Sequence, residues 1–166
     1  MVIITVYQIK EDTKVTLTGK ETDILKDLKA QEELCIEKYE RYEEEAKDPA
    51  LKQIFAEIRR AEQTHLSTIT RILNGEEVAM PSPPKSAASA KYAGETSPCS
   101  GRDKENDAYL CRDALSMEKR VSSVYNTGVF EFCSPILRDT LAHIEKEEQN
   151  HGEQLYSYLE KNGMYN

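Results

Sequence analysis

One pattern of four residues occurs twice in this chain, and the two copies lie 86 residues apart. In each copy a Glu is followed seven residues later by a Tyr, and a Glu-x-x-His begins 23 residues after that Tyr. The first copy is Glu32, Tyr39, Glu62 and His65, and the second copy is Glu118, Tyr125, Glu148 and His151. The same offset relates further pairs of identical residues: Asp27 and Asp113, Pro49 and Pro135, Leu51 and Leu137, Ile58 and Ile144, Gln63 and Gln149, and Leu73 and Leu159. The chain is therefore predicted to contain one structural unit twice.

Apolar residues around both copies recur at steps of three and four, which is the spacing of one face of an α-helix. Each copy spans two such stretches, so we predict helical hairpin 1 at residues 21–75 and helical hairpin 2 at residues 105–166. Residues 76–104 are rich in Pro, Ser, Ala and Gly and lack periodicity, so they are predicted to form a crossover linker. The linker is long enough to cross the whole bundle, which allows the second and third helices to run parallel. We expect residues 21–166 to form one all-α domain, a four-helix bundle of two repeated helical hairpins.

Signals for helix ends accompany this periodicity. Thr18 with Glu21 has the pattern of a capping box at the start of the first helix. Asp48-Pro49 and Ser134-Pro135 each combine a capping residue with a proline, which is favoured at the first helical position. Asn74-Gly75 and Asn162-Gly163 are predicted to end the second and fourth helices.

The first 20 residues follow a different pattern. Apolar residues alternate loosely with polar ones on both sides of a polar stretch at residues 10–14. This favours an N-terminal arm or a short β-hairpin, and a disordered extension is the alternative.

The repeated Glu-x-x-His predicts a site for metal ions. Glu and His three residues apart lie on one face of a helix with Cβ atoms about 5–6 Å apart, so both side chains can reach one ion. Glu32 and Glu118 lie on facing apolar stripes, where an unpaired buried carboxylate costs several kcal/mol. Two divalent ions would balance four glutamates, and none of the four stripes offers a Lys or Arg at that level. The predicted metal ligands are Glu32, Glu62, His65, Glu118, Glu148 and His151.

Composition limits the remaining possibilities. The length of 166 residues suits one domain with a single core. A net charge of −8 argues against binding to nucleic acid or to anionic membranes, and no apolar run approaches the length of a membrane span. The four cysteines contain no Cys-x-x-Cys and are too sparse for a disulfide scaffold, which favours a reducing compartment such as the cytoplasm.

The six predicted ligands resemble the di-iron site of ferritin-like proteins, nearest to that of rubrerythrins. Residues 27–42, 61–69, 107–126 and 147–166 further resemble the coat-F-type spore coat proteins of spore-forming bacteria. Together these resemblances cover residues 21–166 and imply a ferritin-like fold. They imply a centre of two iron ions, although the same ligands also suit Mn or Zn. In that centre Glu32 and Glu118 would chelate or bridge, Glu62 and Glu148 would bridge, and His65 and His151 would each bind one ion.

This resemblance implies a di-iron carboxylate protein that reacts with hydrogen peroxide or dioxygen, with the six ligands as its catalytic residues. Two departures from rubrerythrins qualify it. The chain lacks the four-cysteine iron module that would deliver electrons, so a separate electron-donor protein is expected. Rubrerythrins carry an additional glutamate where this chain has Val121, which puts the peroxidase mechanism of that family in doubt. We further expect a homodimer that resides in the cytoplasm or in the spore coat.

Other interpretations remain open at this level. The protein could be a structural spore coat component whose metals only hold the bundle together, and iron storage is a weaker alternative because no fifth helix is predicted. Tyr39 and Tyr125 are either hydrogen-bond donors next to the metal ligands or ordinary core residues. Cys35 is either a redox thiol or a small core residue, and the latter is favoured. His143 lacks the pattern and is predicted to be exposed.

Overall fold

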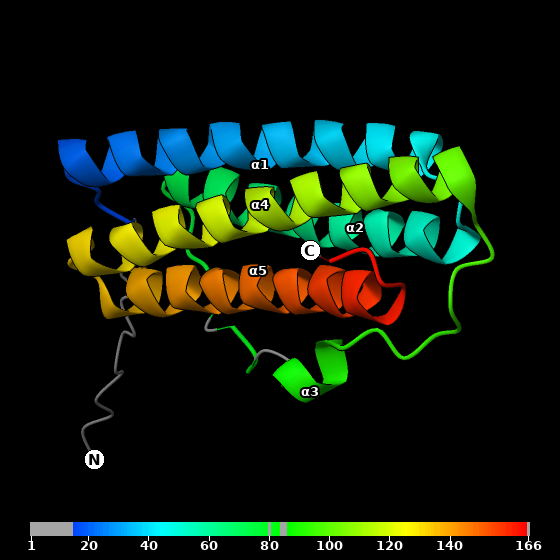
Figure 1. The fold of residues 1–166 in the computed structure, drawn as a ribbon. Helices are drawn as coiled ribbons and strands as arrows, with labels where there is room; N and C mark the ends of the chain where they lie inside the picture. The colour runs from blue at the N-terminus through cyan, green and yellow to red at the C-terminus, as the bar shows by residue number, and fades with distance from the viewer. Residues whose placement is uncertain (1–14, 80, 84–85, 166) are drawn as a thin grey trace, which may run out of the picture.

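The computed structural model of the chain describes residues 15–79, 81–83 and 86–165. Four long helices lie side by side in it: α1 (Gly19–Glu45), α2 (Pro49–Leu73), α4 (Gly101–Glu131) and α5 (Pro135–Lys161) (Figure 1). One short helix, α3 (Ala87–Ala90), interrupts the segment between α2 and α4. No strand occurs in the described part of the chain. The predicted all-α helical bundle is thereby confirmed.

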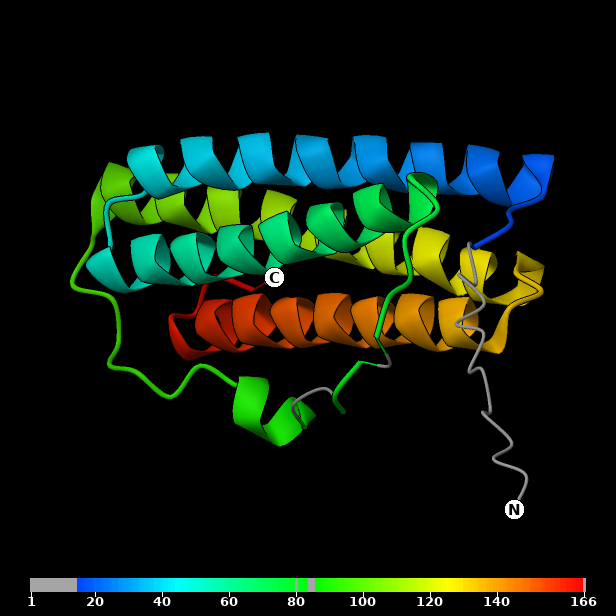
Figure 2. The same cartoon turned by 180° about the vertical axis from the view of Figure 1, so that it is seen from behind.

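The direction of the helices follows from the lengths of their connections. Short turns join α1 to α2 and α4 to α5, so the helices of each pair are antiparallel neighbours. The long segment after α2 returns the chain to the opposite end of the bundle, so that α2 and α4 run in the same direction (Figures 1 and 2). Because α1 also packs against α4, and α2 against α5, all four helices enclose one core.

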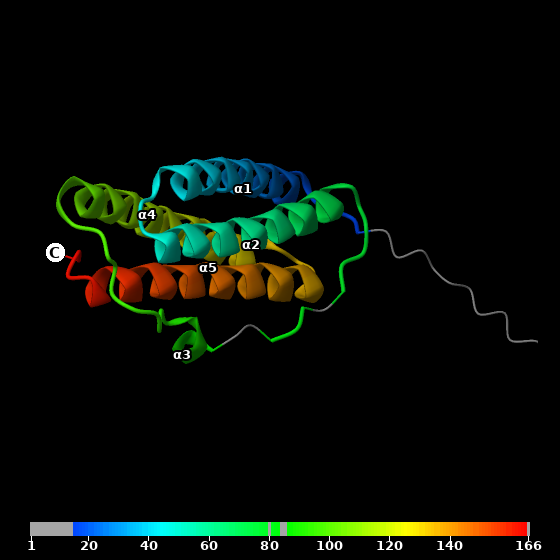
Figure 3. The ribbon, with the colours of Figure 1, turned by 90° about the vertical axis from the view of Figure 1, so that its right-hand side faces the viewer.

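The segment between α2 and α4 is attached to the outer side of α5 (Figure 3). The backbone N–H of Tyr92 donates to Ser157 Oγ over 2.8 Å, and the N–H of Ser97 donates to Asn162 Oδ1 over 2.6 Å. The Tyr92 ring also packs edge-on against Tyr158, with the ring centroids 5.3 Å apart. These contacts set the course of the crossover along the bundle.

The predicted capping signals begin two of the helices. Thr18 and Glu21 form the complete capping box at the start of α1, and Glu21 Oε1 also accepts the backbone N–H of Cys133 over 2.9 Å. Asp48 caps α2 by accepting the backbone N–H of Ala50 over 2.9 Å. Ser134 precedes α5 as predicted, but its side chain makes no capping hydrogen bond. The start of α5 therefore depends on the proline that follows Ser134 and on packing.

The predicted stop signals end α2 and α5 with the same hydrogen bonds. Gly75 and Gly163 have positive φ angles of 76° and 60°, a conformation that residues with a Cβ rarely adopt. After α2 the N–H of Glu76 bonds to the carbonyl of Arg71, and after α5 the N–H of Met164 bonds to that of Leu159. This is the Schellman arrangement, which satisfies carbonyl groups left free at a helix end.

Three boundaries differ from the sequence-based expectation. The helix expected from residue 105 begins at Gly101, because its first turn is largely exposed and carries no apolar stripe that could have signalled it. The predicted linker contains the single helical turn of α3. Of the proposed N-terminal arm, residues 1–14 lie outside the described residues, 15–18 are not helical, and 19–20 already belong to α1.

The apolar stripes of the four long helices meet in a core that contains Leu28, Phe55, Leu115 and Ile144. The buried residues of these helices also include the predicted metal-binding glutamates, which lie near the middle of the helices. The core of the bundle, which is otherwise lined by apolar side chains, thus contains several buried ionisable groups. Within the described residues, none of the helices combines the length and apolar character needed to cross a membrane.

Candidate metal centre

The structure brings all six predicted ligands together inside the bundle. Glu32 comes from α1, Glu118 from α4, and each Glu-x-x-His from α2 or α5. The four glutamates and His65 are at most 2% exposed, and the His151 side chain is 11% exposed. Helix geometry places Glu and His of each pair on one face, one turn apart, which directs both side chains to the same point.

The six residues form two overlapping groups. In each group the candidate ligand atoms lie within 4.8 Å of one another. The first group contains Glu32, Glu62, His65 and Glu148, and the second contains Glu62, Glu118, Glu148 and His151. Because Glu62 and Glu148 belong to both groups, they occupy the positions from which a carboxylate can bridge two ions.

The two imidazoles present the same nitrogen to the shared carboxylates. His65 Nδ1 lies 3.1 Å from Glu148 Oε1 and 3.6 Å from Glu62 Oε2. His151 Nδ1 lies 3.0 Å from Glu62 Oε1 and 3.2 Å from Glu148 Oε2. The imidazole rings are nearly parallel, with centroids 5.9 Å apart and an angle of 24° between their planes. Each histidine is thus placed to bind one ion of a pair.

Several buried atoms of the centre have only these contacts between imidazoles and carboxylates, or none, and make no hydrogen bond of good geometry. They are Glu32 Oε2, Glu62 Oε1 and Oε2, His65 Nδ1, Glu118 Oε2 and Glu148 Oε1. A buried polar atom left unsatisfied costs about 1–3 kcal/mol, and more when it is charged. A cation would satisfy all of these atoms at once. Carboxylate oxygens with imidazole nitrogens suit divalent Fe, Mn or Zn, so the residues fit a pair of such ions.

Without metal, protons balance the charges of the centre. Burial, followed by repulsion from Glu62 and Glu148, raises the pKa of Glu32 to about 10. Burial, with repulsion from the same two carboxylates, also raises the pKa of Glu118. Although burial opposes ionisation of Glu148, the nearby imidazoles hold its pKa below its usual range. Burial thus favours the protonated form of Glu32 and Glu118, and the imidazoles favour the ionised form of Glu148.

The histidines hold protons for the complementary reason. Burial by itself lowers the pKa of an imidazole, but the surrounding carboxylates raise the pKa of both His65 and His151 well above its ordinary value. The carboxylates thus favour the protonated, cationic form of both rings. The same attraction lowers the pKa of Glu62 and Glu148, although burial opposes it.

Tyr39 and Tyr125 connect the two copies of the pattern. The hydroxyl of Tyr39 on α1 donates to Glu118 Oε1 on α4, and the hydroxyl of Tyr125 on α4 donates to Glu32 Oε1 on α1. Both tyrosines are fully buried, so each is a core residue and a hydrogen-bond donor at once. Each one fixes one carboxylate oxygen and leaves the other, Oε2, without a partner in the centre.

One residue of the centre has no signal in the repeat. Glu147 Oε2 lies 2.9 Å from His65 Nε2, the ring nitrogen that faces away from the other glutamates. This hydrogen bond is the main reason why the pKa of Glu147 is lowered. Such a carboxylate fixes the orientation and tautomer of a metal-binding histidine. The repeat could not reveal Glu147, because the equivalent residue of the first copy is Ala61.

The prediction that His143 is exposed is wrong. Its side chain is 19% exposed and its Nε2 lies 3.4 Å from the same Glu147 Oε2. The two residues are four apart on α5 and therefore face the same side of that helix. Cys35 is buried, and burial, followed by the nearby glutamates, raises the pKa of its thiol. Cys35 therefore stays a neutral thiol in the core, as the favoured interpretation held.

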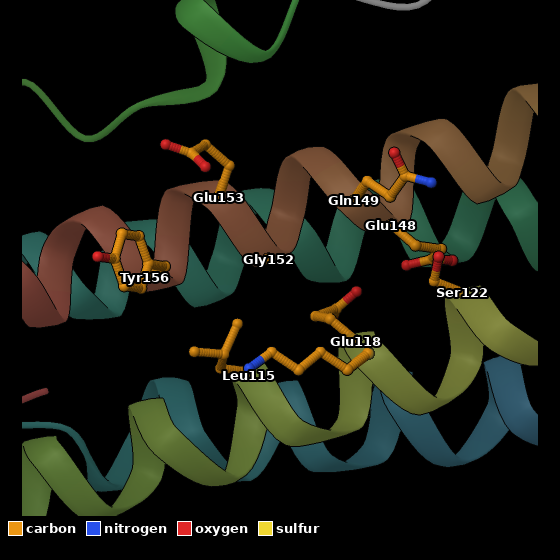
Figure 4. Close-up of a pocket in the computed structure, with 9 residues that line it drawn as sticks. Leu115, Glu118, Ser122, Glu148, Gln149, Gly152, Glu153 and Tyr156 are labelled. Atoms are coloured by element: carbon orange, nitrogen blue, oxygen red, sulfur yellow. The ribbon is translucent and has the colours of Figure 1, made fainter. Parts of the chain in front are cut away.

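A cavity of about 380 Å³ lies between α4 and α5 and reaches the centre (Figure 4). Glu118 and Glu148 line its inner part, with Leu115 and Gly152 beside them. A second cavity, of about 290 Å³, reaches His151 from the side of α2 and α3. The second copy of the pattern is thus approached from the surface on two sides.

Comparison with known proteins gives a family match in the C-terminal part of the chain. Residues 106–166 match the sequence profile of the Coat F domain family. This segment contains most of α4 and all of α5, and with them Glu118, Glu148 and His151. No curated protein and no solved structure matches the chain. The match agrees with the predicted resemblance to coat-F-type proteins over this part of the chain.

Proposed function

We propose that this chain is a spore coat protein that binds two divalent metal ions inside its helical bundle and, with iron, reacts with hydrogen peroxide or dioxygen. The observation that carries this proposal is the pair of buried ligand groups that share Glu62 and Glu148. The Coat F match supports the location of the protein. The parallel course of α2 and α4, joined by a long crossover, is also the topology of ferritin-like proteins and supports a ferritin-like origin of the centre.

Each ligand has a role that follows from its group. Glu62 and Glu148 would bridge both ions, because both residues belong to both groups. Glu32 and His65 would complete the binding of one ion, and Glu118 and His151 that of the other. The hydroxyl groups of the two tyrosines would keep the unshared glutamates in place.

Two ferrous ions in this centre would supply one electron each, so that one hydrogen peroxide and two protons yield two waters without release of hydroxyl radical. The helices provide a buried site around this reaction, since five of the six ligands are at most 2% exposed. Burial raises the pKa of Tyr39 and Tyr125, so both keep their hydroxyl protons and stay hydrogen-bond donors. The described cysteines near the core are neutral thiols, so we assign the supply of electrons to a separate donor protein.

Metal analysis tests this proposal directly. Protein purified from iron-supplemented cells should contain two irons per chain and should show an oxo-bridge absorption band after oxidation. Fewer than one metal ion of any kind per chain would contradict the proposal. The ferrous protein, given a reductant, should turn over peroxide, and Glu62→Ala should abolish this turnover. Glu33→Ala changes an exposed glutamate next to a ligand and should leave turnover unchanged.

The Coat F match also favours a second candidate, a structural coat protein whose ions only stabilise the bundle. Under that interpretation the purified protein contains zinc, and its melting temperature falls when the metal is removed. The iron-loaded form would then show neither oxidase nor peroxidase activity. Activity of the iron-loaded protein separates the two candidates, because a structural centre need not react.

A further inference from the structure

The cavity between α4 and α5 connects the surface with the second ligand group. Figure 4 shows Glu118 and Glu148 projecting from the two helices toward the space between them, with Gly152 on α5 facing α4. Glu118 Oε2 is buried without a hydrogen-bond partner, and both Glu118 and Glu148 line the cavity. Polar residues, including Lys119 and Ser122, complete its outer lining. A small molecule in this cavity would therefore lie next to the candidate ligands of one ion.

Gly152 has no conformational reason to be a glycine. It lies inside α5, one turn after Glu148, and it is not among the glycines with positive φ. A glycine inside a helix lowers helix stability relative to alanine. A Cβ on Gly152 would lie 3.7 Å from Leu115 Cδ1 and 3.9 Å from Glu118 Cβ, which are ordinary contacts. The missing side chain leaves space beside Glu118, and that space belongs to the cavity.

The first copy of the pattern differs at this position. The residue 86 positions before Gly152 is Leu66, which is half-buried on α2. The two copies share their ligands, but a leucine in the first copy replaces the glycine that borders the cavity in the second. Gly152 is thus a departure from the repeat that leaves space on one side of the centre.

We propose that this cavity admits the oxidant, a small peroxide or dioxygen, to the Glu118 side of the centre, and that Gly152 keeps the cavity open. This inference rests on the proposed reaction of the centre. A molecule of two oxygen atoms fits easily in about 380 Å³. Part of the volume remains for a small alkyl group, so a compact organic hydroperoxide should also be accepted.

Two variants close the cavity from opposite walls. Gly152→Leu introduces the residue of the first copy, and Ser122→Leu fills the space from α4. Ala142→Leu is the matched control, because Ala142 is exposed on α5 and does not line the cavity. If Gly152→Leu does not fold, as judged by its helical circular dichroism, Ser122→Leu provides the same test.

The first readout does not depend on activity. In zinc-loaded protein, dissolved dioxygen should enhance the NMR relaxation of the Leu115 methyl groups, because Leu115 lines the cavity. Closing the cavity should reduce this enhancement at least about twofold, while Ala142→Leu should retain it. Equal enhancement in wild type and in the closed variants would overturn the inference.

The second readout is the rate at which peroxides oxidise the ferrous protein. The closed variants should retain two ions per chain, yet hydrogen peroxide should oxidise them about tenfold more slowly, and tert-butyl hydroperoxide more slowly still, because filled space opposes passage. Wild-type rates in a closed variant that holds two ions would overturn the inference and leave the proposed function intact. A wild-type protein that holds iron but is not oxidised would overturn the proposed function and the inference together.

Discussion

The two halves of the candidate centre have the same ligands but different surroundings. His65 is 2% exposed, and its outer nitrogen is held by Glu147 over 2.9 Å. His151 is 11% exposed and borders a surface cavity together with Ala61, the residue equivalent to Glu147. The inner nitrogens of both histidines meet the same shared glutamates, Glu62 and Glu148.

This difference separates what the repeat specifies from what it leaves free. The candidate ligands recur in both copies, and each copy places two carboxylates in the apolar core, where each requires an opposite charge or a proton. The residues around the candidate ligands are not subject to this requirement, so they can differ between the two copies. Glu147 in place of Ala61 holds one histidine, and Gly152 in place of Leu66 leaves space beside one glutamate. We therefore expect two ions with similar ligands and unequal properties.

The largest expected effect distinguishes shared from unshared ligands. Glu62→Ala should remove both ions, because Glu62 belongs to both groups, whereas Glu32→Ala should remove only the ion at His65. The number of zinc ions per chain after dialysis, measured by plasma mass spectrometry, checks this. Retention of two ions by Glu62→Ala would contradict the assignment of Glu62 to both ligand groups, since the centre would then not depend on a shared carboxylate.

The next largest effect concerns pH. Glu32, Glu118, His65 and His151 all have raised pKa values, so folding strengthens the binding of a proton to each of them. Ions that bind these residues must displace such protons, so zinc affinity should rise with pH through neutrality. Calorimetric titration in buffers of different ionisation enthalpy measures the released protons. Proton release by one ion alone would show that the halves do not titrate alike.

The same pKa shifts predict that the stability of the metal-free protein falls as pH rises, whereas zinc affinity rises. A group with a raised pKa binds its proton more tightly when folded, so its contribution to stability is lost as pH rises. For Glu32 this loss runs from its unfolded value of 4.5 to about 10. The difference in melting temperature between zinc-loaded and metal-free protein should therefore widen between pH 6 and pH 8, a range chosen around neutrality.

Local sequence patterns were sufficient to predict the bundle and the meeting of the six candidate ligands in its core. Glu-x-x-His and the lone glutamates lie on apolar stripes, and a stripe must face the core wherever its helix packs. The capping box at Thr18 and the glycines at 75 and 163 act within a few residues, so they too could be predicted.

Those local patterns did not predict the contacts between side chains of different helices. The hydrogen bonds of Tyr39 and Tyr125 cross from one copy to the other, which depends on how α1 lies against α4. Glu147 reaches His65 only because α5 packs on α2, and Glu147 has no equivalent in the first copy. Ser134 likewise makes no capping hydrogen bond, although Ser134-Pro135 has the same local pattern as Asp48-Pro49.

A smaller effect should follow from changing the partner of one histidine. Glu147→Gln should weaken zinc binding at His65 about 10- to 100-fold. The affinity of the ion at His151 should stay unchanged, because Glu147 forms its hydrogen bond with His65 and not with His151. Ala61→Glu is the reciprocal change and should strengthen binding at His151. Competition with a chelator measures both affinities. Equal weakening of both ions by Glu147→Gln would contradict the assignment of Glu147 to one half.

The smallest expected effect compares the contributions of Tyr39 and Tyr125 to the free energy of unfolding, because the two tyrosines make equivalent hydrogen bonds in the two halves of the centre. Tyr39→Phe and Tyr125→Phe each remove one hydrogen bond to a buried glutamate and leave an oxygen without a donor, so each should lower the free energy of unfolding by about 1–2 kcal/mol. Tyr109→Phe is the control, because Tyr109 is 65% exposed and should change stability little. Urea denaturation of the zinc-loaded variants measures these values. Because Tyr39 and Tyr125 make equivalent contacts, their losses should agree. A clear difference would mean that the unequal surroundings of the two ions extend inward to Glu32 and Glu118, so that the asymmetry belongs to the centre itself and not only to the residues around it.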